Sequence, residues 1–248
     1  KKYLKADNSK LVKVGASESM SKSKKNTIDP ENIISIYGAD AARLFILSDS
    51  PPEKDVQWSE EGISSSFKFV QKLWNLNEKI TEEINKNHKE DTDEELIKYT
   101  NRFLKKISGN LENFSYNKII ANLHEMYSQL TKLINKSYKK ETLTENYQKI
   151  LVSMQPILPH FSNECLQLMD LKNFKWPDYD DKLTKEDKIN LVVQVNGKKR
   201  GLIPLDPDKT EEEILEITRK DKQIVKYLQD NQIKKSIYIK NKLLNIII

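Results

Sequence analysis

Apolar residues recur at every third or fourth position between residues 60 and 87, with lysine and glutamate on the positions between them. This spacing places the apolar side chains on one face of a helix. It predicts a long amphipathic helix whose inner positions are Ile63, Phe67, Val70, Leu73 or Trp74, Asn77, Ile80 and Ile84. After a polar break, Thr92 and Glu95 have capping-box spacing and predict a second helix that ends at Gly109.

The same periodicity predicts further helices on both sides of this pair. A third helix opens near Phe114, a fourth spans about 144–154, and the prolines of the run 155–164 break one helix and begin the next. Upstream, Asp29 and Pro30 have the residue types of a helix start and Gly38 those of a stop, and a short helix follows over 41–47. The charged run 178–188 is predicted to be a linker, and 10–14 a possible strand.

The last sixty residues change to a period of two. Residues 189–196 and 200–205, joined by Gly197 and Lys198, predict a β-hairpin. Thr210 and Glu213 form a second capping box that opens a helical region to about residue 229, and two strands follow over 235–239 and 243–248. The chain is therefore predicted to be mainly α, with an antiparallel helical bundle followed by a small α+β domain.

The charge of the chain is unevenly distributed, although the net value of the 248 residues is only +5. Residues 1–25 hold eight lysines and two acids, residues 26–181 carry a net −6, and residues 182–248 carry a net +5. Two basic ends fit an anion-binding loop and a basic terminal module. The single cysteine, Cys165, excludes an internal disulfide and a cysteine-based zinc site. No apolar run approaches the roughly 20 residues of a membrane span, so we expect a cytoplasmic protein with no membrane contact.

The run from Met20 to Asn26 is the strongest candidate for chemistry. Three lysines and two serines lie within it, and their ammonium and hydroxyl groups suit a loop that meets phosphate oxygens. Read by composition alone, such a run is also typical of a solvated surface or a nucleic-acid patch.

The residues that follow favour the first interpretation. Residues 20–58 resemble the KMSKS signature of class I aminoacyl-tRNA synthetases and the segment that follows it. The resemblance begins at Met-Ser-Lys-Ser, continues through Asp29-Pro30 and the run that ends at Leu47, and extends to Trp58. The run 155–164 resembles the proline-histidine signature of the helical bundle in that class. Residues 193–201 and 236–246 resemble the carboxyl-terminal domain of bacterial leucyl-tRNA synthetases, which favours that family. One departure is Ser19, which stands where the family has its first lysine.

The resemblance implies ATP-dependent attachment of leucine to tRNA(Leu) through leucyl-adenylate. Lys22 would be the catalytic residue and would act on the ATP phosphates, Ser21 and Ser23 would donate hydrogen bonds to them, and Met20 would pack to set the pose of the loop. Mg²⁺ is expected with ATP, but no metal ligand is identified. Candidate tRNA contacts, as a group, are Lys198, Lys199, Arg200, Lys234 and Lys235.

The resemblance also implies a domain order. Residues 1–59 would be the end of a catalytic domain with its loop and connecting helices, 60–180 an anticodon-binding-type bundle, and 181–248 a small tRNA-binding domain. The family's other nucleotide signature, His-x-Gly-His, is absent. We therefore expect a carboxyl-terminal portion of a longer, monomeric enzyme that is inactive alone.

Two alternatives remain. One is another class I synthetase, for valine, isoleucine or methionine, and the other is a non-catalytic RNA-binding module. His88, His124 and His160 are too scattered to predict a metal site or a catalytic base.

Overall fold

The computed structural model describes residues 15–48, 51, 53–86, 93–171, 175–185, 188–228 and 233–248. The predicted strand 10–14, His88 and the capping residue Thr92 lie outside these ranges. The chain divides into two compact units, one ending at Asp178 and one beginning at Tyr179. Within the described ranges, no helix combines the length and the apolarity that crossing a membrane requires.

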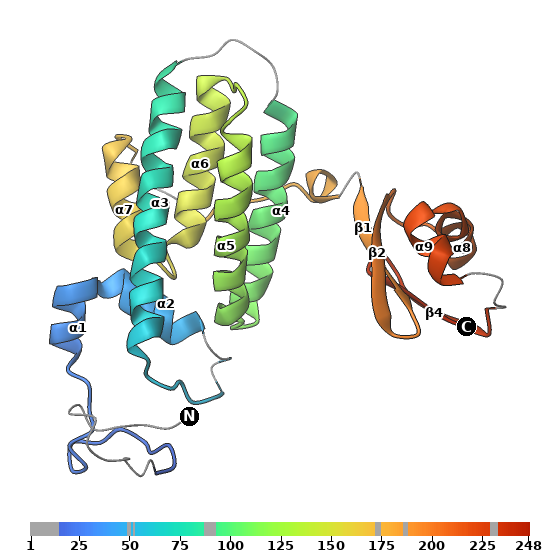
Figure 1. The fold of residues 1–248 in the computed structure, drawn as a ribbon. Coiled ribbons are helices and arrows are strands. Elements are labelled where there is room, and N and C mark those ends of the chain that lie inside the picture. Colours follow the sequence, from blue (N-terminus) through green and yellow to red (C-terminus); the bar gives the residue numbers. More distant parts are fainter. Residues whose placement is uncertain are drawn as a thin grey trace. The chain divides into compact units, whose positions relative to one another are not determined.

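The first unit is an all-helical bundle (Figure 1). Its helices are α1 (Pro30–Tyr37), α2 (Ala39–Ser48), α3 (Glu60–Lys86), α4 (Asp93–Glu112), α5 (Tyr116–Leu133), α6 (Lys140–Met154) and α7 (Pro159–Leu168). Helices α3 to α6 pack side by side, and α2 packs against α3 and α5 at one end of the bundle. The core is closed by fully buried residues of each long helix, among them Ile80, Ile107, Leu123 and Ile150.

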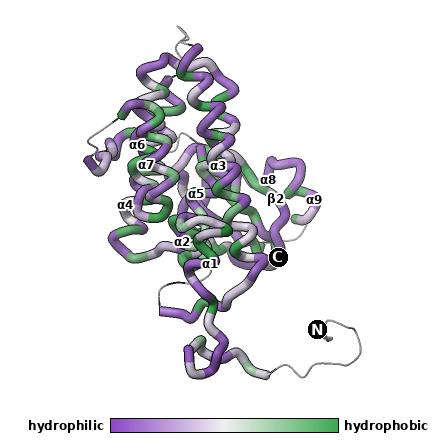
Figure 2. The backbone as a smooth tube through the Cα atoms, turned by 90° about the vertical axis from the view of Figure 1, so that its left-hand side faces the viewer, coloured by the Kyte–Doolittle hydropathy of each residue, from purple (hydrophilic) through white to green (hydrophobic). Residues whose placement is uncertain are grey.

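The bundle confirms the mainly helical prediction and adds detail to the inner face of α3. Figure 2 shows hydrophobic and hydrophilic segments alternating along the helices, as the amphipathic pattern requires. Ser66, Phe69 and Leu76 are buried on α3, whereas Phe67 and Trp74 are only half-buried. The buried Asn77 is satisfied by the Tyr147 hydroxyl, which donates to its side-chain oxygen at 3.0 Å.

Two predicted boundaries in the bundle were wrong. Helix α4 continues past Gly109 to Glu112, because the amide of Asn113 still donates to the Gly109 carbonyl and glycine costs a helix little where other contacts hold it. Helix α6 begins at Lys140, four residues early, because its cap comes from another helix. The Asp93 carboxylate of α4 accepts from the Lys139 amide at 3.3 Å and from the Thr142 hydroxyl at 2.9 Å.

The second unit is a four-stranded sheet in the order β2-β1-β4-β3. The strands are β1 (Ile189–Val195), β2 (Lys198–Leu205), β3 (Lys235–Ile239) and β4 (Leu243–Ile247), with β1 parallel to β4 and the outer pairs antiparallel. Helices α8 (Glu211–Lys220) and α9 (Lys222–Leu228) cover one face, and a buried core that includes Leu191, Val193, Ile214 and Ile224 lies between the helices and the sheet.

The hairpin and the helical region of this unit differ from the prediction in two places. The turn is Asn196-Gly197 rather than Gly197-Lys198, since both residues have the positive φ (50° and 75°) that a two-residue hairpin turn demands. The helical region breaks at Asp221, whose carboxylate accepts from the amides of Gln223 (2.8 Å) and Ile224 (3.2 Å) and so starts α9. The capping box of Thr210 and Glu213 is present as predicted.

The predicted linker contains a short element of its own. Residues Asp181–Thr184 form a 3-10 turn, and the side chain of Asp180 caps it by accepting from the Lys182 amide at 2.8 Å.

Candidate functional site

The lysine-rich loop is a closed turn rather than an extended strand. The side-chain oxygen of Asn26 accepts from the Ser21 amide at 2.8 Å, and its amide donates to the Ser19 carbonyl at 3.3 Å. The amides of Lys24 and Lys25 donate back to the carbonyls of Ser21 and Lys22. One asparagine side chain therefore joins the two ends of the loop.

The charges on this turn are not equivalent. Lys24 pairs with Glu18 at 3.1 Å, so its ammonium already has an anionic partner. Lys22 and Lys25 are exposed, and no described acidic group lies within 4 Å of either. Lys25 lies at a positive φ of 52°, a conformation that non-glycine residues adopt infrequently. Within the described residues, the ammonium groups of Lys22 and Lys25 are thus available to an external anion.

The hydroxyl groups of the turn lie close to one another. The Ser21 and Ser23 oxygens are 3.2 Å apart, and the Ser21 oxygen also accepts from the Lys24 amide at 3.3 Å. Met20 is 47% exposed, and none of the described core clusters includes it, so its role in setting the pose of the loop stays a prediction.

The loop is joined to the bundle through α1, whose start follows the predicted pattern. Asp29 caps the helix by accepting from the Glu31 amide at 3.1 Å, and Pro30 occupies the first turn. Gly38, at φ 81°, ends α1, and its amide donates to the Ile34 carbonyl at 2.9 Å. A glycine is required there because other residues rarely adopt this φ.

Helix α2 is fastened to the α6–α7 connection by two charged side chains. The buried Asp40 carboxylate accepts from the amides of His160 (3.3 Å) and Phe161 (2.6 Å), at the start of α7. Arg43 donates to the carbonyls of Pro156 (2.6 Å) and Ile157 (3.1 Å). A carboxylate at a helix N-terminus is stabilised by the free amides and the helix dipole there. Helix α2 is thereby held against residues that lie more than 110 positions later in the chain.

These contacts also define the role of the proline-histidine run. As predicted, Pro156 follows the end of α6 and Pro159 begins α7. The run also supplies the backbone groups that Asp40 and Arg43 bind, which sequence reasoning missed because the partners are so distant in the chain. His160 is exposed, and His124 lies against the Phe69 ring with centroids 3.8 Å apart, where burial lowers its pKa. Neither histidine belongs to a group of three or more possible metal ligands among the described residues.

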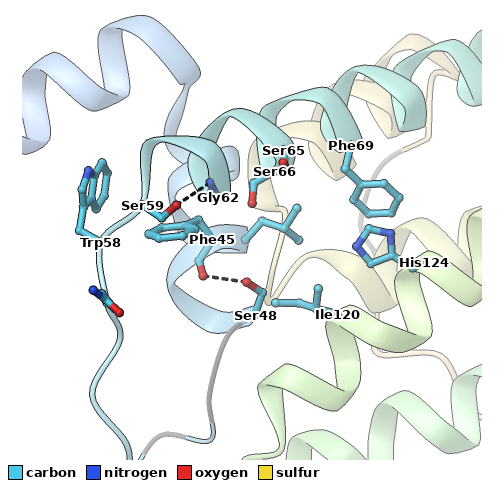
Figure 3. A pocket seen from close by; sticks show the side chains of 12 residues that line it. Phe45, Ser48, Trp58, Ser59, Gly62, Ser65, Ser66, Phe69, Ile120 and His124 are labelled. Carbon is cyan, nitrogen blue, oxygen red and sulfur yellow. Dashed lines mark hydrogen bonds between the residues drawn. The ribbon is translucent and has the colours of Figure 1, made fainter. Parts of the chain in front are cut away.

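A cavity of about 620 Å³ opens between α2, the connection that precedes α3, the first turns of α3, and α5 (Figure 3). Phe45 lies at its centre, Trp58 at one end, and the tilted pair of Phe69 and His124 rings at the other. Trp58 meets Phe45 edge to face, with ring centroids 5.2 Å apart. Four serines and Gln57 line the cavity but no lysine or arginine does, so it does not suit a phosphate group.

The five candidate tRNA contacts lie at one end of the sheet but at opposite edges. Lys198 pairs with Val195 at the end of β1, and Lys235 pairs with Ile247 at the end of β4. Three strand spacings separate them, about 14 Å. The candidates therefore form two groups, one of Lys198, Lys199 and Arg200 and the other of Lys234 and Lys235.

A β-bulge in β2 determines which face of the sheet the side chains of the first group occupy. Val193 pairs with Gly201 but Gln194 pairs with Lys199, so Arg200 is an extra residue in β2. In a strand without a bulge, side chains alternate between the two faces, so Lys198 and Arg200 would lie on the face opposite to Ile203 and Leu205. Ile203 and Leu205 are both buried, so Lys198 and Arg200 would then lie on the other face of the sheet. Because of the bulge, Lys198 and Arg200 face the helices together with the buried Ile203 and Leu205. Arg200 accordingly lies over the Tyr227 ring of α9, with its guanidinium carbon 4.2 Å from the centroid.

A metal centre is not apparent in the described ranges, where no group of three or more histidine, cysteine or acidic side chains has ligating geometry. The residues of the loop fit the phosphates of ATP, because they offer two ammonium groups that no described acid pairs and two hydroxyl groups that lie close together. They offer no carboxylate for Mg²⁺ except Glu18, which pairs with Lys24.

Comparison with known proteins identifies two families along the chain. The model of the anticodon-binding domain of tRNA ligase matches residues 93–216, which is half of the chain. The model of the class I tRNA synthetases (I, L, M and V) matches residues 8–59, which include the loop.

Curated relatives match the chain over nearly its whole length. A leucine–tRNA ligase of Prochlorococcus marinus (strain AS9601) is 37% identical over 98% of the chain, and that of Orientia tsutsugamushi (strain Boryong) is 37% identical over 96%. The chain spans only 29% and 28% of these relatives. Among solved structures, a LeuRS–tRNA–LeuAMS ternary complex of Agrobacterium radiobacter K84 shares the fold, with a TM-score of 0.71, 22% identity, and coverage of 92% of this chain and 31% of that one.

The loop and the docked α2 thus lie in the segment that the class I synthetase model matches, and helices α4 to α7 lie in the segment that the anticodon-binding model matches. The chain belongs to the anticodon-binding domain family of tRNA ligases, and it is similar to leucine–tRNA ligases along nearly its whole length.

Proposed function

We propose that the full-length protein that contains this chain is a leucine–tRNA ligase, which joins leucine to tRNA(Leu) at the expense of ATP. The observation that carries the proposal is the Lys22 ammonium, which no described acid pairs, on a loop closed by Asn26 and joined to a tRNA-ligase-type bundle. A pure RNA-binding module has no use for such a loop. We expect the enzyme to be monomeric and cytoplasmic.

The first step is the attack of the leucine carboxylate on the α-phosphorus of ATP, which forms leucyl-adenylate and releases pyrophosphate. Negative charge grows on the β- and γ-phosphates as the bond breaks, and a fixed cation lowers the energy of that state more than that of bound ATP. Lys22 supplies this cation, and Ser21 and Ser23 supply hydroxyl donors 3.2 Å apart. Mg²⁺, when bound with ATP, adds charge neutralisation to the phosphates.

Ser19 leaves the loop one cation short of the family pattern, and we assign the replacement to Lys25. Lys24 is bound to Glu18, whereas Lys25 has no such partner among the described acids. The conformation of Lys25 at φ 52° follows from the turn that Asn26 closes, so its position is set by the same hydrogen bonds as that of Lys22.

In the second step a hydroxyl group of the terminal ribose of the tRNA attacks the leucyl carbonyl carbon of the adenylate, which forms the ester and releases AMP. The bundle and the basic second unit hold the tRNA by phosphate contacts. Such contacts fix the position of a folded RNA through its shape and charge. The five candidate residues of the second unit belong to this step.

The amino acid is tested by pyrophosphate exchange with the full-length protein. Leucine should support exchange with ATP, while valine, isoleucine and methionine at equal concentration should support it at least 100-fold less. Exchange that depends on one of the other three would assign the protein to that synthetase. The absence of exchange with any of the four would favour the RNA-binding module.

A further inference from the structure

The basic end of the second unit contains a cavity of about 380 Å³ between the β1–β2 turn and α9. Its polar lining consists of Asn196, Lys198, Arg200, Lys226 and Tyr227, and no acidic side chain contributes to it. Three cationic side chains from two elements therefore converge on one concave site. Lys226 was not among the residues that the sequence singled out.

These cations have no anionic partner within the part of the chain that the structure describes. No salt bridge joins Lys198, Arg200 or Lys226 to a described acid, and the Arg200 Nε is buried without any hydrogen-bond acceptor. A buried N–H that lacks an acceptor is unfavourable, and three like charges around one cavity repel each other. An anion in the cavity relieves both.

The site is also held in place before anything binds. Arg200 packs over the Tyr227 ring at 4.2 Å, and the ammonium of Lys226 lies 5.1 Å from the same ring. Asn196 accepts from the Ile248 amide at 3.2 Å, which fixes its side chain and leaves its amide hydrogens to donate. A guanidinium stacked on an aromatic ring loses less freedom when it binds than a free lysine does.

We propose that this cavity binds one phosphodiester group of the tRNA backbone, with Arg200 as its central donor and Lys198 and Lys226 on either side. The proposal rests on the proposed function, because it takes the ligand to be tRNA. Arginine suits a phosphate because its planar fork makes two parallel hydrogen bonds. The cavity near Phe45 is larger but has no cation in its lining, so it does not compete as a phosphate site.

The test is the affinity of the full chain for a tRNA(Leu) transcript, measured by fluorescence anisotropy over a range of salt concentrations. Arg200→Gln, Lys198→Ala and Lys226→Ala should each weaken binding about 5- to 30-fold and lower the slope of log affinity against log salt by about one. The matched control is Lys188→Ala, which removes the same charge about 23 Å along β1 from the strand position that pairs with Lys198, and should change affinity less than 2-fold.

Arg200→Gln disturbs a packed side chain, so the two exposed lysines keep the test decisive if that variant misfolds. Equal losses of tRNA affinity in Lys188→Ala and in the cavity variants would mean that binding depends on the overall positive charge of the unit. That result would overturn the proposal. Unchanged tRNA affinity in Lys198→Ala and Lys226→Ala would also overturn the proposal, and would indicate that the cavity binds a protein carboxylate instead. The exchange assay separates the two proposals, because leucine-dependent exchange in the full-length variants should stay normal even where tRNA affinity falls.

Discussion

The carboxylate of Asp40 accepts a hydrogen bond of 2.6 Å from the backbone amide of Phe161, a residue 121 positions later in the chain. It also accepts from His160 at 3.3 Å, so one buried side chain caps a helix to which it does not belong. This contact, with Arg43 beside it, fastens the segment that carries the lysine-rich loop to the bundle. The stability of that junction is directly testable.

Asp40→Ala should destabilise the first unit by about 2 kcal/mol or more, because it leaves two amides without their acceptor. The measurement is urea unfolding followed by tryptophan fluorescence, which reports on this unit because Trp58, Trp74 and Trp176 all lie in it. Asp29→Ala, which removes an exposed cap of α1, is the control and should cost about 1 kcal/mol or less. Equal small losses in the two variants would show that the Asp40 contact is dispensable.

Gly62→Ala should destabilise the same unit by about 1–3 kcal/mol, since the new methyl group would lie 2.4 Å from the Phe45 ring. Gly109→Ala, where nothing lies within 4 Å, should instead stabilise it by about 0.5–1 kcal/mol through helix propensity. Phe45→Leu should reduce the cost of Gly62→Ala in a double-mutant cycle. A cost that stays the same in that background would mean that the ring is not the obstacle.

Stability should fall as the pH rises above about 9. Burial raises the pKa of the Cys165 thiol from 9.0 to about 12, and it also raises the pKa of Tyr138 to about 12. Groups whose pKa is higher in the folded state contribute stability that is complete below the unfolded value and is lost as the pH rises toward the folded one. The Cys165 shift alone predicts a loss of about 2–3 kcal/mol between pH 8 and pH 11.

Urea unfolding at intervals across that range measures the loss. Cys165→Ala should make the curve shallower, because the alanine does not titrate. A curve that is flat to pH 11 in the original chain would contradict the burial of the thiol.

Deletion of residues 179–248 from the full-length protein should weaken tRNA charging at least 10-fold and leave leucine-dependent pyrophosphate exchange within about 2-fold. The reason is that the proposed phosphate contacts lie in this unit, while the loop at Lys22 lies in the other. The two assays are run on the same preparation. A parallel fall of both would mean that the second unit supports the catalytic fold and not tRNA binding.

Much of the fold could be predicted from local pattern. The stripe from Ile63 to Ile84 located α3, and Asp29, Gly38 and the pair of Thr210 and Glu213 located helix ends, because each acts on backbone groups within a few residues. Position and residue type were sufficient in these cases. The turn at Asn196 was misplaced by one residue, since the positive φ at two successive positions is seen only in the structure.

The rest depends on contacts between distant residues. No local rule pairs Asp93 with the start of α6, or Asp40 with Phe161, because the capping residue lies 46 to 121 positions away. The candidate site shows the same limit. Lys198 and Arg200 were found as a basic run, but Lys226 and Tyr227 join them only through the fold and the bulge at Val193.

The central claim is that Lys22 acts on the phosphates of ATP, and pyrophosphate exchange by the full-length protein tests it most directly. Lys22→Ala should slow leucine-dependent exchange by about 100-fold or more, as the loss of one preorganised donor does elsewhere. Lys24→Ala, which removes an ammonium already paired with Glu18, should slow it only a few-fold, and Lys25→Ala should lie between the two. Normal exchange in Lys22→Ala, or equal losses in Lys22→Ala and Lys24→Ala, would contradict the account.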